Sequence, residues 1–246
     1  MTDFHYSPIQ EAVCEFRFSK GTEWDGDLAS ILYNLLKDEF PDKKQKISHK
    51  LEIKANINGI ESQKIEPINT DVFLSKDGKV LIQIYHRMIS INCLRPYPSW
   101  EVFNKKIETV YSALQKIVKI EKIDRIGLLY INKIDIDEKT VELGDYFNFY
   151  PHLSPEFPQG IENFIVGCEF TYKDGSEFLK LDLGKTFPSK KDSNAFLLRE
   201  EYYTAPTHSV KPADAMDWIN NAHYELKKLY NACITEQTKK ILDEKE

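Results

Sequence analysis

The order of predicted elements in this chain repeats, and that repetition limits its fold more than any other feature. Residues 11–118 predict a strand, a helix, three strands and a long helix, and residues 125–234 predict the same order again. Each half ends in an amphipathic helix that opens with a tryptophan, Trp100 in one and Trp218 in the other. We therefore predict an α+β fold of two tandem, pseudo-duplicated units, 1–120 and 121–246, that form one compact body.

Hydrophobic periodicity sets the boundaries within the first unit. The predicted elements are strands over 11–18, 48–57, 71–75 and 79–94 and helices over 25–40 and 100–118. Residues 58–70 are predicted to be a loop. Asp77-Gly78 favours a tight hairpin turn, and Ser99 is placed to cap the long helix that follows it.

The second unit follows the first less closely near its short helix. Its predicted elements are strands over 124–136, 163–173, 176–186 and 195–204, a short helix over 144–152 and a final helix over 213–242. Lys173-Asp174-Gly175 is a second tight turn, and tight turns join antiparallel neighbours. We therefore expect largely antiparallel sheets, each covered by one of the long amphipathic helices.

Composition argues against several classes of protein. The 246 residues carry a formal net charge of −6, which disfavours nucleic-acid binding because phosphate recognition needs a concentrated basic surface. The sequence lacks an apolar run of membrane-spanning length and opens without the basic and apolar segments of a signal peptide, so we expect a cytoplasmic protein. All four cysteines, Cys14, Cys93, Cys168 and Cys233, fall on predicted apolar faces and are expected to be buried, reduced thiols.

Catalytic motifs are not apparent in the sequence. The six histidines are scattered without metal-ligand spacing, and the 10 glycines include no Gly-x-Gly that could cradle a phosphate. A serine nucleophile elbow is absent as well. These observations favour a protein that is not an enzyme and assign it no catalytic, cofactor-binding or metal-ligating residues.

Charged residues at alternate strand positions form the one candidate site. If the sheets curl toward each other on their polar side, these side chains would line a groove: Glu15, Arg17, Glu52, Arg87, Lys180 and Arg199. Such a groove could bind a polyphosphate with a metal, as in the triphosphate-tunnel enzymes, although the opening Glu-x-Glu-x-Lys strand of that family is not matched. The alternative is a solvated sheet face whose opposite charges pair across strands.

Several segments resemble a sporadically distributed prokaryotic protein family of unknown function. They are Pro8-Ile9-Gln10-Glu11-Ala12-Val13, Tyr97-Pro98-Ser99-Trp100-Glu101-Val102-Phe103, Arg125-Ile126-Gly127-Leu128-Leu129-Tyr130-Ile131-Asn132 and the terminal helix from Ala222-His223. The resemblance implies a cytosolic protein from a mobile or defence-linked locus, with no established activity. Leu129 stands where the family usually has arginine. The motifs suggest structural roles: Ser99 would cap a helix, Trp100 would anchor it to the sheet, and Asn132 would bond a backbone group.

Three functions follow as hypotheses of different classes. The first is a non-enzymatic binding or regulatory protein that acts through a protein partner or self-association, in a bacterial defence or toxin–antitoxin setting. The second is a phosphate- or nucleotide-handling enzyme that uses the charged strand face. The third is a nucleic-acid-binding saddle, which rests on fold analogy alone.

Overall fold

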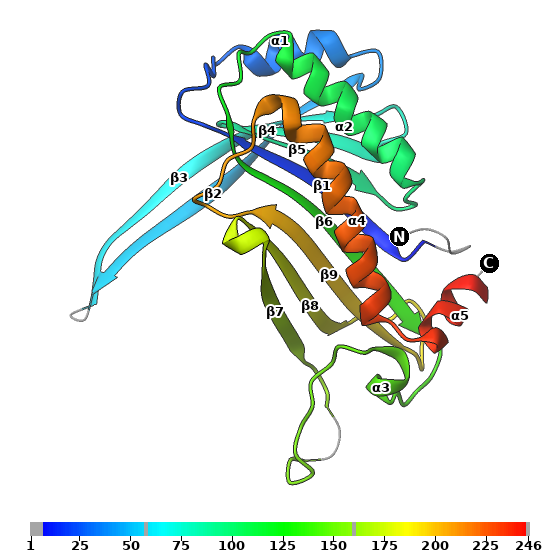
Figure 1. Cartoon of the computed structure of the whole chain (residues 1–246). Helices are drawn as coiled ribbons and strands as arrows, with labels where there is room; N and C mark the ends of the chain where they lie inside the picture. The colour runs from blue at the N-terminus through cyan, green and yellow to red at the C-terminus, as the bar shows by residue number, and fades with distance from the viewer. Residues whose placement is uncertain (1–6, 57–58, 159–160, 245–246) are drawn as a thin grey trace.

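The computed structural model describes residues 7–56, 59–158 and 161–244, without the side chains of residues 48–68 and 244. Within these residues, nine strands form one continuous antiparallel sheet with helices packed against it (Figure 1). The strands are β1 (Ile9–Phe18), β2 (Asp42–Asn56), β3 (Gly59–Leu74), β4 (Val80–Tyr85), β5 (Met88–Leu94), β6 (Ile123–Ile136), β7 (Ile165–Tyr172), β8 (Glu177–Thr186) and β9 (Asn194–Thr204). The helices are α1 (Leu28–Leu36), α2 (Trp100–Gln115), α3 (Leu143–Tyr146), α4 (Ala215–Cys233) and α5 (Glu236–Glu244).

The sheet is centred on a pair of strands that are far apart in sequence. Its order is β2-β3-β4-β5-β1-β6-β9-β8-β7, and β1 pairs with β6 with Cys14 opposite Leu128. The expectation of two separate sheets is therefore wrong, because backbone hydrogen bonds between β1 and β6 join the halves. Outward from this central pair, β5, β4 and β3 follow on one side, and β9, β8 and β7 follow on the other.

The first half contains four strands between its helices, where the sequence predicted three. The predicted loop over 58–70 is wrong from Gly59 onward, because these residues belong to strand β3, which continues into the predicted strand over 71–75 and pairs with β2 from Gly59 opposite Asn56 to Leu74 opposite Asp42. Residue 58 lies outside the described residues. The predicted strand over 79–94 is two strands, β4 and β5, joined at His86 and Arg87. Arg87 has a φ of 54°, and its carbonyl accepts a hydrogen bond of 2.8 Å from the Phe18 amide. Long-range pairing thus supplies backbone partners that local periodicity does not reveal.

The helices also differ in extent from their predictions. The final helix breaks at Ile234, which has extended dihedrals and forms an isolated bridge with Phe147, so its last part is the separate helix α5. Helix α1 spans nine residues, and α3 spans four. The predicted cap at Ser99 is confirmed, since its Oγ accepts a hydrogen bond of 3.3 Å from the Val102 amide.

The long helices contact the central strands. Helix α4 packs on β6 and β9, and α2 packs on β5. Tyr111 of α2 stacks on Phe16 of β1 with ring centroids 5.0 Å apart, and Trp218 of α4 contacts Tyr202 of β9 with centroids 5.6 Å apart. No helix within the described ranges is long and apolar enough to cross a membrane.

One cysteine prediction is wrong. Cys14, Cys93 and Cys233 are buried as expected, but Cys168 is exposed. Cys168 lies on β7, the last strand of the sheet, and most residues of this strand are exposed. The alternation correctly placed Cys168 on the apolar face, but it could not reveal that helices leave this face uncovered at the edge.

Candidate functional site

Four of the six predicted site residues lie in one line of charges across the sheet. We call this line the charge row; it lies on the face opposite the long helices and crosses β1, β6, β9, β8 and β7. Its members are Glu15, Arg17, Arg125, Glu201, Arg199, Lys180, Asp182 and Glu169. Glu15, Arg17, Lys180 and Arg199 are thus brought together as the sequence suggested.

Arg125 joins the two halves of the charge row. Its guanidinium donates hydrogen bonds to Glu15 Oε1 at 2.7 Å and to Glu201 Oε1 at 2.5 Å. The Cζ atom of the guanidinium lies 4.6 Å from the Tyr203 ring centroid. Arg125 belongs to one of the motifs above and is not among the six predicted site residues. The signal for its place was strand alternation: Ile126 and Leu128 point to the buried face, so Arg125 points to the same face as Gly127 and Leu129.

The remaining members extend the row toward the edge. Arg199 bonds Glu201 at 2.8 Å and Asp182 at 3.4 Å, and Lys180 lies 3.8 Å from Asp182. Glu169 lies opposite Lys180 in the strand register and accepts a hydrogen bond from the Tyr203 hydroxyl. Burial is the main cause that raises the pKa of Tyr203 to about 12, and the Glu169 carboxylate is the second cause.

The charges of the row balance. Four cations stand beside four carboxylates, so each guanidinium already has an acidic partner within the protein. A phosphate would have to displace those carboxylates, and the row carries no surplus positive charge to attract a nucleic acid. This arrangement fits paired charges on a solvated face better than an anion-binding groove.

The other two predicted residues lie outside the row. Arg87 lies in the turn between β4 and β5, where its guanidinium contacts the His86 ring at 2.8 Å. The side chain of Glu52 lies outside the described residues. Leu129, where the resembled family usually has arginine, lies opposite Glu201 in the β6–β9 register. An arginine at that position would therefore face a carboxylate of the row.

A second polar group lies on the opposite, helix-covered face of the sheet. Glu200 is fully buried and lies opposite Tyr130 in the register of β6 and β9. Asn132 Nδ2 donates to Glu200 Oε2 and to the Leu198 carbonyl, each at 3.3 Å. Burial raises the pKa of Glu200 well above its ordinary value, because the apolar surroundings disfavour the ionised form of this carboxyl. Phe196, Leu198 and Tyr202 alternate around Glu200, and this pattern was the signal for its burial.

Residues of the quoted motifs form a second set of contacts on the helix-covered side of the sheet. Trp100 of α2 stacks on His223 of α4, with ring centroids 4.0 Å apart and planes 6° apart. Trp100 therefore joins the two long helices directly, where the sequence suggested an anchor to the sheet. The His223 Nδ1 atom lies 2.9 Å from the Tyr130 hydroxyl, and burial lowers the pKa of His223 to about 4. The cluster is neutral and packed, which indicates a structural role.

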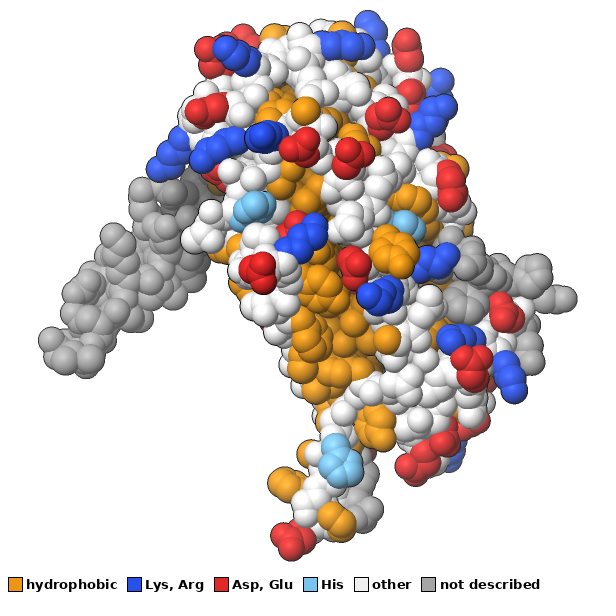
Figure 2. Space-filling view, viewed as in Figure 1, with side chains coloured by type: hydrophobic (Ala, Val, Ile, Leu, Met, Phe, Trp, Pro, Cys, Tyr) orange, Lys and Arg blue, Asp and Glu red, His pale blue; other side chains and the backbone are white. Residues whose placement is uncertain are grey.

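The face of β7 that lies on the helix side of the sheet is only partly covered. We call this surface the apolar strip; its residues are Phe164, Val166, Cys168, Phe170 and Tyr172. In the register with β8, the strip faces buried leucines, with Val166 opposite Leu183 and Cys168 opposite Leu181. Figure 2 shows apolar atoms exposed over these strands beside α4.

Exposed apolar side chains gather around this strip. Half of the large hydrophobic side chains that the described part of the chain exposes lie between residues 150 and 170. Phe157 is 57% exposed, Phe170 is 43% exposed and Ile165, on the other face of β7, is 81% exposed. Contiguous exposed apolar surface of this kind marks interaction sites on soluble proteins.

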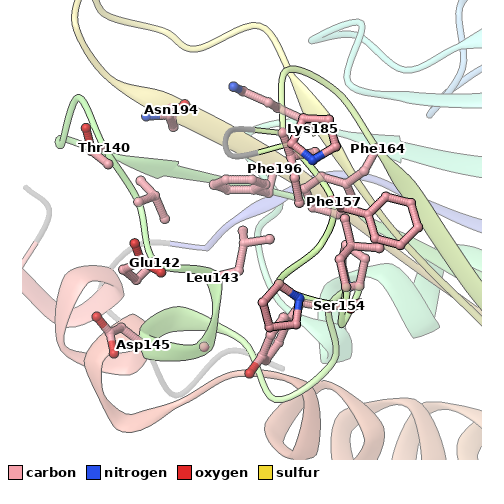
Figure 3. A pocket seen from close by; sticks show the side chains of 18 of the residues that line it. Thr140, Glu142, Leu143, Asp145, Ser154, Phe157, Phe164, Lys185, Asn194 and Phe196 are labelled. Carbon is pink, nitrogen blue, oxygen red and sulfur yellow. The ribbon is translucent and has the colours of Figure 1, made fainter.

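A cavity of about 880 Å³ continues the strip beyond the start of β7 (Figure 3). Its walls include the apolar side chains of Leu143, Phe157, Phe164 and Phe196, and its rim carries charged residues such as Lys185. Phe164 belongs to both the strip and the cavity. Of the six residues predicted from the charged strand face, the five whose side chains the structure describes do not line it.

A metal-binding group is not found among the described residues, which hold no cluster of three or more histidine, cysteine or acidic side chains. No family model matches the chain, and no curated protein matches it. The resemblance to the sporadic prokaryotic family therefore stays a prediction that rests on the motif residues alone.

Proposed function

We propose that this protein is a non-enzymatic binding protein that acts through a protein partner, and that the partner docks on the apolar strip. The observation that carries this proposal is the exposure of Phe170 and Cys168 on a face that is otherwise core. Within the strip no residue is charged, so contact with an apolar partner surface would leave no unpaired charge buried.

We propose an amphipathic helix as the docking element. In the first half, α1 lies over the outer strands beside α2, and its Tyr33 contacts Phe73 of β3 with ring centroids 5.2 Å apart (Figure 1). Leu28, Leu32 and Leu36 of α1 are buried there. In the second half, the chain between β6 and β7 forms only the short helix α3, and within the described residues no helix occupies the corresponding place over β7 and β8.

The matching strand order of the two halves supports this comparison. We propose that the chain is a tandem duplication, in which β1-β5-β4-β3 corresponds to β6-β9-β8-β7. On that reading the second unit lacks the helix that covers the first, and a partner helix supplies it. The resemblance described above suggests a defence or toxin–antitoxin locus as the setting.

Site-specific photo-crosslinking tests the proposal. A benzophenone amino acid replaces Phe170 in one variant and Phe187, 90% exposed in the loop between β8 and β9, in a second. We expect a heterologous partner to cross-link in the native host from position 170 and not from position 187. A Phe170→Glu substitution should abolish copurification of that partner, whereas Phe187→Glu should not. Equal cross-linking from both positions, or partner retention by the Phe170→Glu variant, would contradict the proposal.

A further inference from the structure

Strand β7 is the last strand of the sheet within the described residues, and its outer edge presents a defined set of backbone groups. The Lys185 amide donates to the Phe164 carbonyl at 3.2 Å, so Phe164 belongs to a hydrogen-bonded pair with β8. In an antiparallel ladder such pairs alternate, which directs the N–H and C=O groups of Val166, Cys168 and Phe170 toward β8 as well. The same groups of the intervening residues point away from the sheet; these residues are Ile165, Gly167, Glu169 and Thr171.

We infer that a second copy of this chain pairs with that edge, so that β7 of each copy forms an antiparallel ladder with β7 of the other. An extended strand is the occupant that can satisfy these groups, since only a strand presents donors and acceptors at the same spacing. The strand has few features that blunt an edge. It contains no proline and no lysine, and Glu169 is its single charged residue.

The sequence of β7 selects one register for this self-pairing. Outward-pointing residues must face outward-pointing residues, so the twofold axis passes beside one residue of the strand. An axis at Glu169 would place two Glu169 carboxylates directly opposite each other, which is unfavourable. An axis at Cys168 pairs Ile165 with Thr171 and Gly167 with Glu169 of the second copy. All four outward residues then have partners, for about eight backbone hydrogen bonds.

The chosen register also matches the side chains. On the helix-side face, Phe170 of one copy lies opposite Val166 of the other, and the two Cys168 side chains face each other at the axis. Because an axis perpendicular to the sheet keeps each face on its own side, the two apolar strips join into one surface. Glu169 keeps its contact with Tyr203 on the opposite face while Gly167 of the second copy leaves room beside it. The charge and shape of the strand thus favour a second copy of the chain as its partner.

The dimer differs from the helix docking proposed above and does not depend on it. A monomer would still present the apolar strip to a partner helix. Conversely, two copies could pair along β7 whether or not a partner helix binds. A cross-linked product of twice the chain mass marks self-association, and any other mass marks a heterologous partner.

Cys168 provides a reporter that is already in the chain. At the axis the two Cys168 residues form a pair without backbone hydrogen bonds, where Cα atoms lie about 4.5 Å apart, within the range of a disulfide. Diamide, which accepts two electrons and two protons as two thiols become a disulfide, should convert the purified protein to a covalent dimer. Cys168→Ser should abolish this dimer because Cys14, Cys93 and Cys233 are buried. A protein that stays monomeric after diamide treatment at micromolar concentration would overturn the inference.

A proline at the open edge tests the pairing without oxidation. The Thr171 amide points away from β8, so Thr171→Pro removes a donor that the monomer does not use, and edge strands tolerate proline there. Thr171→Val keeps the amide and is the matched control. In sedimentation velocity, we expect dimers of the wild type and Thr171→Val and monomers of Thr171→Pro, all with unchanged circular dichroism. A dimer that survives Thr171→Pro, or a wild type that is monomeric throughout, would refute the β7 interface.

Discussion

The buried carboxyl of Glu200 makes stability depend on pH in a way that a single substitution should remove. Burial raises the pKa of Glu200 in the folded protein, so the folded state keeps this proton to a higher pH than the unfolded chain, in which the group ionises above its ordinary pKa of about 4.5. The unfolded state therefore binds fewer protons, and stability falls as pH rises until the pH reaches the raised pKa of the folded state. Glu200→Gln keeps the size of the side chain and has no proton to lose.

The magnitude follows from one proton. A difference of one bound proton changes the free energy of unfolding by about 1.4 kcal/mol per pH unit, or about 2.7 kcal/mol between pH 6 and pH 8. We expect the Glu200→Gln variant to gain up to this amount on the wild type over that interval, and the full amount where the raised pKa of the folded carboxyl lies above the interval. Burial lowers the pKa of His223 from 6.5 to about 4 and raises the pKa of Cys233 from 9.0 to about 12, but both contributions are common to the two proteins and cancel in the difference between them.

Urea unfolding at pH 6, 7 and 8 measures this difference for the wild type and the variant. Glu201→Gln is the control, because Glu201 lies next in sequence but points into the charge row, where it pairs with Arg125 and Arg199. Its effect on stability should not vary over the interval. Parallel stability curves for the wild type and Glu200→Gln would show that Glu200 is ionised in the folded protein and would refute this reasoning.

Further substitutions test the charge row, a helix cap and a turn. Arg125→Met should lower the free energy of unfolding by about 1–2 kcal/mol, because it removes two ion pairs of an arginine side chain that is only 22% exposed. Arg17→Met, at a side chain that is 54% exposed, should lower it by under about 0.5 kcal/mol in the same urea titrations. High salt should reduce the difference in free energy of unfolding between these two variants, because it screens ion pairs. An equal loss of stability in the two variants would mean that Arg125 does not join the halves of the row. Ser99→Ala should cost about 1 kcal/mol in thermal or urea unfolding, with Ser112→Ala on the exposed side of α2 as the control; equal effects of the two would argue against the cap. Gly78→Ala should cost about 1–2 kcal/mol because Gly78 has a φ of +68°, whereas Gly26→Ala, at a glycine without positive φ, should have a smaller effect.

Sequence periodicity predicted those elements whose contacts match their local pattern. Strands β1, β8 and β9 were placed within two residues, because each alternates between the covered face and the charge row. Strand β3 was predicted only from residue 71 onward, because polar residues and Pro67 interrupt the pattern of its earlier part. The pairing of that part with β2 is decided by strand contacts rather than by local propensity. The single sheet was missed for the same reason, since the pairing of β1 with β6 joins residues more than a hundred positions apart.

The candidate site was predictable only in part. Opposite charges at alternate positions correctly placed Glu15 and Arg199 on one face, but their mutual neutralisation depends on the strand order, which brings Arg125 between them. The apolar strip was hidden because an exposed apolar strand and a buried one have the same alternation. What separates them is whether a helix crosses above, and nothing within residues 164–172 encodes that.

The central place of β1 has a consequence for synthesis on the ribosome. This strand emerges before the other strands of the sheet, and one of its two neighbours, β6, ends only at Ile136. Until that segment leaves the exit tunnel, the edge of β1 that pairs with β6 lacks its partner strand and the hydrophobic core is incomplete. Such intermediates associate readily with other chains. Chaperone binding to the nascent chain should therefore be highest before β6 is complete and should fall once β1 and β6 have paired.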